Sequence, residues 1–165
     1  MVLKILFRIS DFLNLFAKGF SGICLGLMII IMIAEVIWRN SFMSITWSEE
    51  VTATFLGTWF IFVGASVPLK GGQLIGVQFI KSRLPMKVAI TVTIAGGLMT
   101  LIFLSLVTKY GFNLVKITMS QPSPALMWPM GYAYLAVPVG CLIMFYQTLI
   151  LMLQGKTSAD GFTIS

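Results

Sequence analysis

Long uncharged runs separated by charged residues dominate the chain. The first run continues through Glu35 close to its end, and the next two are bounded by charges on both sides. The last run follows the segment TMSQPSPALMWPMG, whose turn-forming residues delay the start of a helix to about Gly131. Each run supplies the roughly 20 residues that a helix needs to cross about 30 Å of hydrocarbon. The pattern therefore predicts four transmembrane helices, at 19–38, 51–69, 88–108 and 131–153.

Two further segments have the pattern of elements that lie along a membrane surface. In residues 1–18 the charged side chains recur at helical spacing opposite a face of Leu, Ile and Phe, which predicts an amphipathic interfacial helix leading into the first span. A plain N-terminal extension of the first span is the alternative. Residues 71–85 lie between Gly71-Gly72 and Pro85 and alternate apolar and basic positions. They are compatible with a short in-plane arm or with an irregular loop.

Composition assigns the chain to the integral membrane proteins. Of its 165 residues 58% are hydrophobic and only 10% are charged, too few to cover the surface of a soluble domain of this size. We expect an all-α fold forming a single membrane domain over residues 1–165. Histidine is absent, which excludes imidazole-based metal sites, haem ligation and His general bases, and we expect no metal or cofactor in this chain. The basic residues are scattered between apolar runs, so nucleic acid is not an expected partner.

The distribution of Lys and Arg predicts the orientation. An even number of spans places both termini on one side, and eight of the eleven basic residues fall on the side of the termini and of the loop at 71–85. The positive-inside rule therefore predicts cytoplasmic termini. Most Trp and Tyr residues cluster at the opposite ends of the spans, where their rings suit the membrane interface.

The carboxylates near the outer ends of the spans require a physical reason. Thr46 and Glu49 have the spacing of a capping box at the start of the second helix. The adjacent Glu50 is left without a role by this capping. Glu35 precedes Arg39 by four residues, so we expect an ion pair between them on one helix face.

Other features of the spans predict packing rather than transport. Gly22 and Gly26 form a small-xxx-small face suited to close helix contact, and Pro138 should kink the fourth helix. No span carries several polar groups that converge at mid-depth, as the substrate site of a transporter would. The chain is more typical of the support of a membrane machine than of its moving part.

Several motifs in fixed order resemble one family. The motifs that carry this resemblance are, in order, EVIWRNSF, WSEE, Gly64, Lys70, VQFIKSRLP and SPALMWPMGYAYLAVPVG. With these motifs the chain resembles the small membrane subunit, of the DctQ or SiaQ type, of tripartite ATP-independent periplasmic (TRAP) transporters. The chain departs from that family at Gln73 and Gln78, where His and Asp are frequent. The candidate partner-interface or structural residues are Glu35, Arg39, Trp47, Ser48, Glu49, Glu50, Lys70, Pro124, Pro138 and Gly140.

The resemblance implies a complex in the bacterial inner membrane. Its large multi-span subunit holds the substrate and sodium sites, and a periplasmic binding protein delivers an organic anion such as a C4-dicarboxylate or a sialic acid. The small subunit would stabilise the static scaffold of the large one and help to dock the binding protein, in contact with membrane lipid. We expect Glu50 to meet a partner's basic residues there, while Glu49 caps the helix.

Two other function classes are alternatives. A stand-alone four-helix exporter would use a membrane carboxylate as a proton switch, and Glu35 is the candidate, although it lies near a helix end and beside Arg39. An embedded enzyme is the weaker alternative, because these residues supply no catalytic constellation.

Overall fold

The computed structural model describes residues 2–41, 46–70 and 86–153, which are helical apart from short connections and contain no strand. Four helical stretches are long and apolar enough to span a membrane, as the sequence predicts. They are Leu6–Asn40, Trp47–Lys70, Ile94–Thr118 and Gly131–Met152. The elements are α1 (Val2–Ser41), α2 (Thr46–Glu49), the π-helix η1 (Glu50–Leu56), α3 (Gly57–Gly64), α4 (Ser66–Lys70), α6 (Met86–Thr118), α7 (Gly131–Tyr134) and α8 (Ala136–Leu153).

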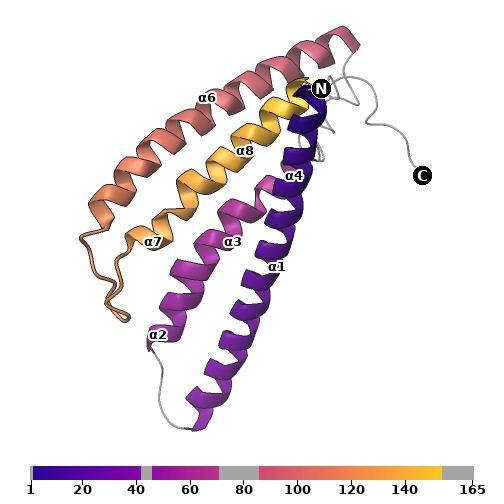
Figure 1. Cartoon of the computed structure of the whole chain (residues 1–165). Coiled ribbons are helices and arrows are strands. Elements are labelled where there is room, and N and C mark those ends of the chain that lie inside the picture. The colour runs from indigo at the N-terminus through magenta and orange to yellow at the C-terminus, as the bar shows by residue number, and fades with distance from the viewer. Residues whose placement is uncertain (1, 42–45, 71–85, 154–165) are drawn as a thin grey trace.

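The four spans form a row instead of a closed bundle. α1 packs against α3, α3 against α8, and α8 against α6, and at the terminal end α1 also meets α8. In the described part of the chain α6 makes no comparable packing with α1 or α3. Figure 1 shows α1 and α6 at opposite edges of this row. Of the apolar window of each span, 44% is buried in the fourth and only 11% in the first. The last helix is therefore the centre of the fold, and the first helix forms an edge.

The chain reverses direction so that the row has two distinct ends. The terminal end holds the starts of α1 and α6 and the ends of α4 and α8 (Figure 1). There the Lys70 ammonium forms an ion pair with Asp11, and the Tyr146 hydroxyl donates a hydrogen bond to the Leu6 carbonyl at 3.1 Å. The loop end holds the end of α1, α2 and the connection between α6 and α7 (Figure 1).

Two prolines interrupt the second and fourth spans in the same way. α3 and α4 are separated at Ala65, three residues before Pro68, and α7 and α8 at Leu135, three residues before Pro138. Proline has no N–H to donate to the carbonyl four residues earlier, so the helical ladder is broken just ahead of it. The bend expected from Pro138 is thus present as an interruption at Leu135, and Pro68 produces a second one.

Close contact at the centre of the row depends on Gly140. A Cβ atom at this position would lie 2.6 Å from the Phe62 carbonyl oxygen and 2.7 Å from its carbonyl carbon, both backbone atoms of α3. Beside this contact lies a core of buried residues, with Phe62, Val107, Val137 and Phe145 packed around it. The buried residues are Leu69, Leu104, Cys141 and Met144. Gly140 therefore sets the distance between α8 and α3.

The structure corrects two expected boundaries. Residues 2–41 form one 40-residue helix, so the interfacial helix expected at 1–18 is not a separate element. Its buried face continues without a change of register through Ser10, Ala17, Ser21 and Cys24, and the contacts at the terminal end anchor it. The third helix continues ten residues past the predicted end at 108, to Thr118, because a lysine side chain can extend toward the interface without ending a helix.

The small-xxx-small face of α1 makes no close helix contact among the described residues. Gly22 is exposed, and a Cβ built at Gly22 or Gly26 meets nothing within 4 Å. Ser21 packs beside Gly64 of α3 instead, because the buried stripe of α1 lies on a neighbouring face. The segment 71–85, for which an in-plane arm or loop is predicted, lies outside the described residues.

Candidate functional site

The second span begins with a seven-residue π-helix, η1, which follows α2 directly. Its wider turn appears in the hydrogen bond that the Gly57 N–H donates to the Thr52 carbonyl, five residues earlier. A Cβ on Gly57 would lie 2.9 Å from that oxygen, so glycine permits the close approach. The Thr52 hydroxyl donates to the Ser48 carbonyl, and both side chains are buried. Short π-helical turns of this kind are frequent at functional sites.

The carboxylate of Glu50, the first residue of η1, binds the backbone of the loop between α6 and α7, at the same end of the fold. Its Oε2 accepts hydrogen bonds from the Ala125 N–H at 2.8 Å and the Leu126 N–H at 3.2 Å. The Ser123 hydroxyl, which is fully buried, also hydrogen-bonds the carboxylate. Glu50 thus holds a turn that lies 75 residues further along the chain.

The turn presents these amides because of its own geometry. The Met127 N–H donates to the Ser123 carbonyl at 3.1 Å, and the Leu126 N–H also approaches the Ser123 Oγ at 3.3 Å. Pro124 follows Ser123 and is exposed, which suits the second position of a turn, where no N–H is needed. Met127 has a φ of 58°, the left-handed conformation that ends the turn. A single helical turn directs its first free N–H groups outward, where they form a concave site for an anionic oxygen.

Aromatic contacts complete the attachment of the loop. Trp128 packs edge-on to Phe55 of η1, with ring centroids 6.3 Å apart. Trp59, the tryptophan that the sequence places in mid-span, donates its indole N–H to the Tyr132 carbonyl of α7 at 3.1 Å. Its ring also lies edge-on to Phe20 of α1, with centroids 5.8 Å apart. We call residues 119–130 the clamped loop, because a carboxylate, backbone hydrogen bonds and aromatic contacts all hold it against η1.

The clamped loop also has a large exposed apolar surface. Met127 and Trp128 are 73% and 61% exposed, and Tyr132, just beyond the loop, is 54% exposed. A loop whose backbone is fixed while its aromatic side chains point outward is suited to contact a membrane interface or a protein.

The structure gives Glu50 a contact within the chain that the sequence does not predict. The Glu50 carboxylate, expected to meet a partner, is engaged by the amides of the loop. Glu49 is exposed and makes no side-chain capping hydrogen bond to η1, whereas its expected capping of the helix start at Thr46 stays a prediction. Its neighbour Trp47 is 49% exposed, and the side chain of Thr46, the other half of the expected capping box, lies outside the described side chains. Which glutamate points at the loop depends on the π-helical turn, and a capping motif alone does not predict that turn.

The other candidate residues are distributed between the two ends of the row. Glu35 is half-buried near the end of α1, and among the described residues it forms no ion pair with Arg39, contrary to expectation. A pair at this spacing is worth only about 0.3–0.5 kcal/mol, too little to hold two flexible side chains together near an exposed helix end. Lys70, assigned from its motif alone, is bound to Asp11 at the terminal end. The opposite charges of these two residues are visible in the sequence, but not their proximity.

Comparison with known families matches most of the chain. The family model described as "Tripartite ATP-independent periplasmic transporters, DctQ component" matches residues 28–156. The match covers η1, the clamped loop and the packed centre of the row, but not the first half of α1. No curated protein matches the chain.

Proposed function

The chain belongs to the DctQ component family of TRAP transporters, and from this premise we propose that it is the non-catalytic scaffold subunit of a sodium-driven importer of organic anions. As a TRAP component it is a multi-pass membrane protein. In this proposal a large multi-span subunit carries the substrate and sodium sites and a periplasmic binding protein delivers the anion, whereas this chain holds no cofactor. Its membrane is the bacterial inner membrane, with the termini in the cytoplasm.

The observation that carries the scaffold role is the open row of helices. A closed bundle would bury the apolar faces of its helices, but the edge helices here leave large apolar side chains uncovered. On α6 these include Met99, Ile102 and Phe103, which are 73%, 62% and 63% exposed. A row one helix thick suits a protein that widens the membrane face of a larger partner. Lipid covers the remainder.

The clamped loop supports a second part of the proposal, which is docking of the binding protein. With cytoplasmic termini, the loop end faces the periplasm, and Met127 and Trp128 are the exposed side chains that a soluble partner would meet there. Glu50 acts from within by fixing the backbone of the loop, and it does not itself contact the partner.

The test is affinity purification of the tagged chain from its native membrane in mild detergent, followed by identification of the proteins that co-purify. We expect a stoichiometric, much larger multi-span membrane protein. Recovery of the chain alone or as a homodimer would overturn the scaffold role. In that case transport by the chain alone in proteoliposomes, abolished by Glu35→Gln, would establish the exporter alternative.

A further inference from the structure

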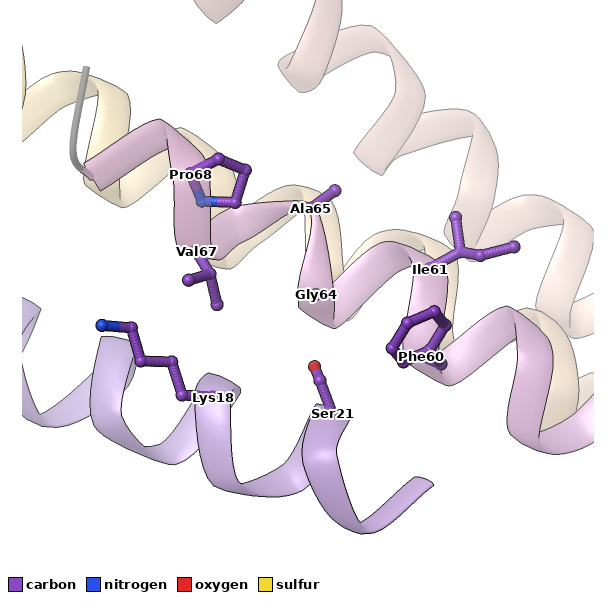
Figure 2. Close-up of a pocket in the computed structure, with 8 residues that line it drawn as sticks. All are labelled: Lys18, Ser21, Phe60, Ile61, Gly64, Ala65, Val67 and Pro68. Atoms are coloured by element: carbon purple, nitrogen blue, oxygen red, sulfur yellow. The ribbon is translucent and has the colours of Figure 1, made fainter. Parts of the chain in front are cut away.

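A cleft of about 430 Å³ opens between α1 and the interruption that separates α3 from α4 (Figure 2). Two features of the second span create it. Pro68 breaks the helix, and Gly64 leaves no side chain where α3 faces Ser21 of α1. The volume lies within the roughly 300–1,000 Å³ of small-ligand sites. A helix, about 10–12 Å across with its side chains, needs a longer groove than this.

The polar groups of the cleft lack partners among the residues that the structure describes. Ser21 is only 8% exposed, and its hydroxyl makes no hydrogen bond in the described structure. A buried hydroxyl without a partner is costly, so the structure calls for a group that can bond to it. Lys18, one turn earlier on α1, is exposed and forms no ion pair or hydrogen bond within the described part of the chain. Both side chains lie along the same side of the cleft (Figure 2).

The local charge favours an anion. Asp11, two helical turns before Lys18 on α1, is neutralised by its ion pair with Lys70. Among the described residues the ammonium of Lys18 is thus the charge without an ion pair at this end of the cleft, and ammonium groups bind phosphate oxygens with strong, charge-assisted hydrogen bonds.

The opposite wall of the cleft is apolar, and the charged part and the apolar part of its lining lie at different ends. Lys18 lies across from Val67 and Pro68, whereas Phe60 and Ile61 line the other end, toward the middle of the span (Figure 2). Ile61 is 61% exposed. A ligand that matches this arrangement has an anionic head and an apolar chain that extends toward the membrane centre.

We propose that this cleft is a specific phospholipid site. The phosphate of the head group binds the Lys18 ammonium and the Ser21 hydroxyl, and one acyl chain lies against Phe60 and Ile61. The bound lipid fills the gap that Pro68 and Gly64 leave between α1 and the second span. This site requires only that the chain is inserted in a membrane, and it does not depend on the proposed function.

The experiment is a lipid titration of the full-length chain, purified in mild detergent and delipidated, with native mass spectrometry counting the bound phosphatidylglycerol. We expect one molecule to bind at concentrations well below those at which further lipids associate. Lys18→Gln removes one interfacial positive charge and should weaken the binding of this first lipid about fivefold. Val67→Phe, which fills the cleft, should abolish it, whereas Lys109→Gln on α6 is the matched control and should leave it unchanged.

Two further ligands distinguish the contribution of the lipid's phosphate head group from that of its acyl chains. Diacylglycerol with the same acyl chains should bind more weakly than phosphatidylglycerol, and soluble glycerol phosphate should not displace the lipid. Displacement by glycerol phosphate would mean a site for small phosphates and would overturn the proposal. Equal binding by the wild type and by Lys18→Gln, an exposed substitution that keeps the fold, would overturn it as well.

Discussion

Replacement of Gly140 by alanine should destabilise the whole row of helices. The added Cβ would lie 2.6 Å from the Phe62 carbonyl oxygen, about 0.8 Å closer than ordinary contact, which begins at 3.4 Å. The atoms that it meets belong to the backbone of α3, so no side chain can rotate to make room. α8 must move away from α3, and since α8 also packs on α6, the shift affects both of its interfaces. Overpacking of this kind costs about 1–3 kcal/mol in the free energy of unfolding.

The assay is unfolding of the purified chain in mixed micelles by increasing detergent denaturant, followed by circular dichroism and tryptophan fluorescence. The matched control is Gly96→Ala on α6, where a Cβ meets nothing within 4 Å. Because alanine favours a helix over glycine by about 0.5–1 kcal/mol, the control should be neutral or slightly stabilising. If Gly140→Ala unfolds at the same denaturant fraction as the control, the contact between α8 and α3 is not as close as the structure has it.

Three further substitutions test the contacts at the two ends of the row. Glu50→Gln removes the charge that holds the loop amides, so amide hydrogen exchange in the loop should accelerate. Glu49→Gln is the control and should leave the exchange unchanged. Equal effects of the two variants would contradict the assignment of the clamp to Glu50. Trp59→Phe keeps an aromatic ring but loses the indole hydrogen bond to α7. It should lower the free energy of unfolding by about 0.5–1.5 kcal/mol in the same denaturation assay. An unchanged free energy of unfolding would count against that hydrogen bond. Asp11→Asn breaks the ion pair with Lys70 at a largely exposed site, so it should cost less than about 1 kcal/mol, and the difference from wild type should shrink in high salt.

The clamp explains how the loop end of the protein stays ordered. The turn that Glu50 holds is a single helical turn, and apart from Glu50 it is held by backbone hydrogen bonds within the loop and by the contact between Trp128 and Phe55. Charge-assisted hydrogen bonds to backbone amides fix the path of the chain while leaving the exposed side chains free. Partner contact and loop order can therefore be separated by mutation: Glu50→Gln tests order, and Trp128→Ala tests contact.

Local chemistry determined much of this fold. Uncharged runs of about 20 residues predict spans because hydrocarbon excludes charge and an unpaired backbone, and this rule needs no knowledge of neighbours. The interruption near Pro138 is similarly local, since proline removes a donor wherever it stands. The same rule applied to Pro68 would have predicted the break at Ala65 beside the cleft between α1 and the second span.

The order of the helices, the partner of Glu50 and the ion pair of Lys70 were decided only by the tertiary structure. Apolar positions on α1 and α6 look alike in sequence, because lipid and protein interiors are equally apolar and hydrophobicity does not distinguish a packed face from one that meets lipid. The contact between Glu50 and Ala125 joins residues 75 positions apart, and it forms only when packing of α8 on α3 brings the loop beside η1. The sequence by itself determined which segments enter the membrane, because that choice depends on each segment's own transfer free energy. The tertiary structure decided which faces meet, because packing depends on the fit of two surfaces at once.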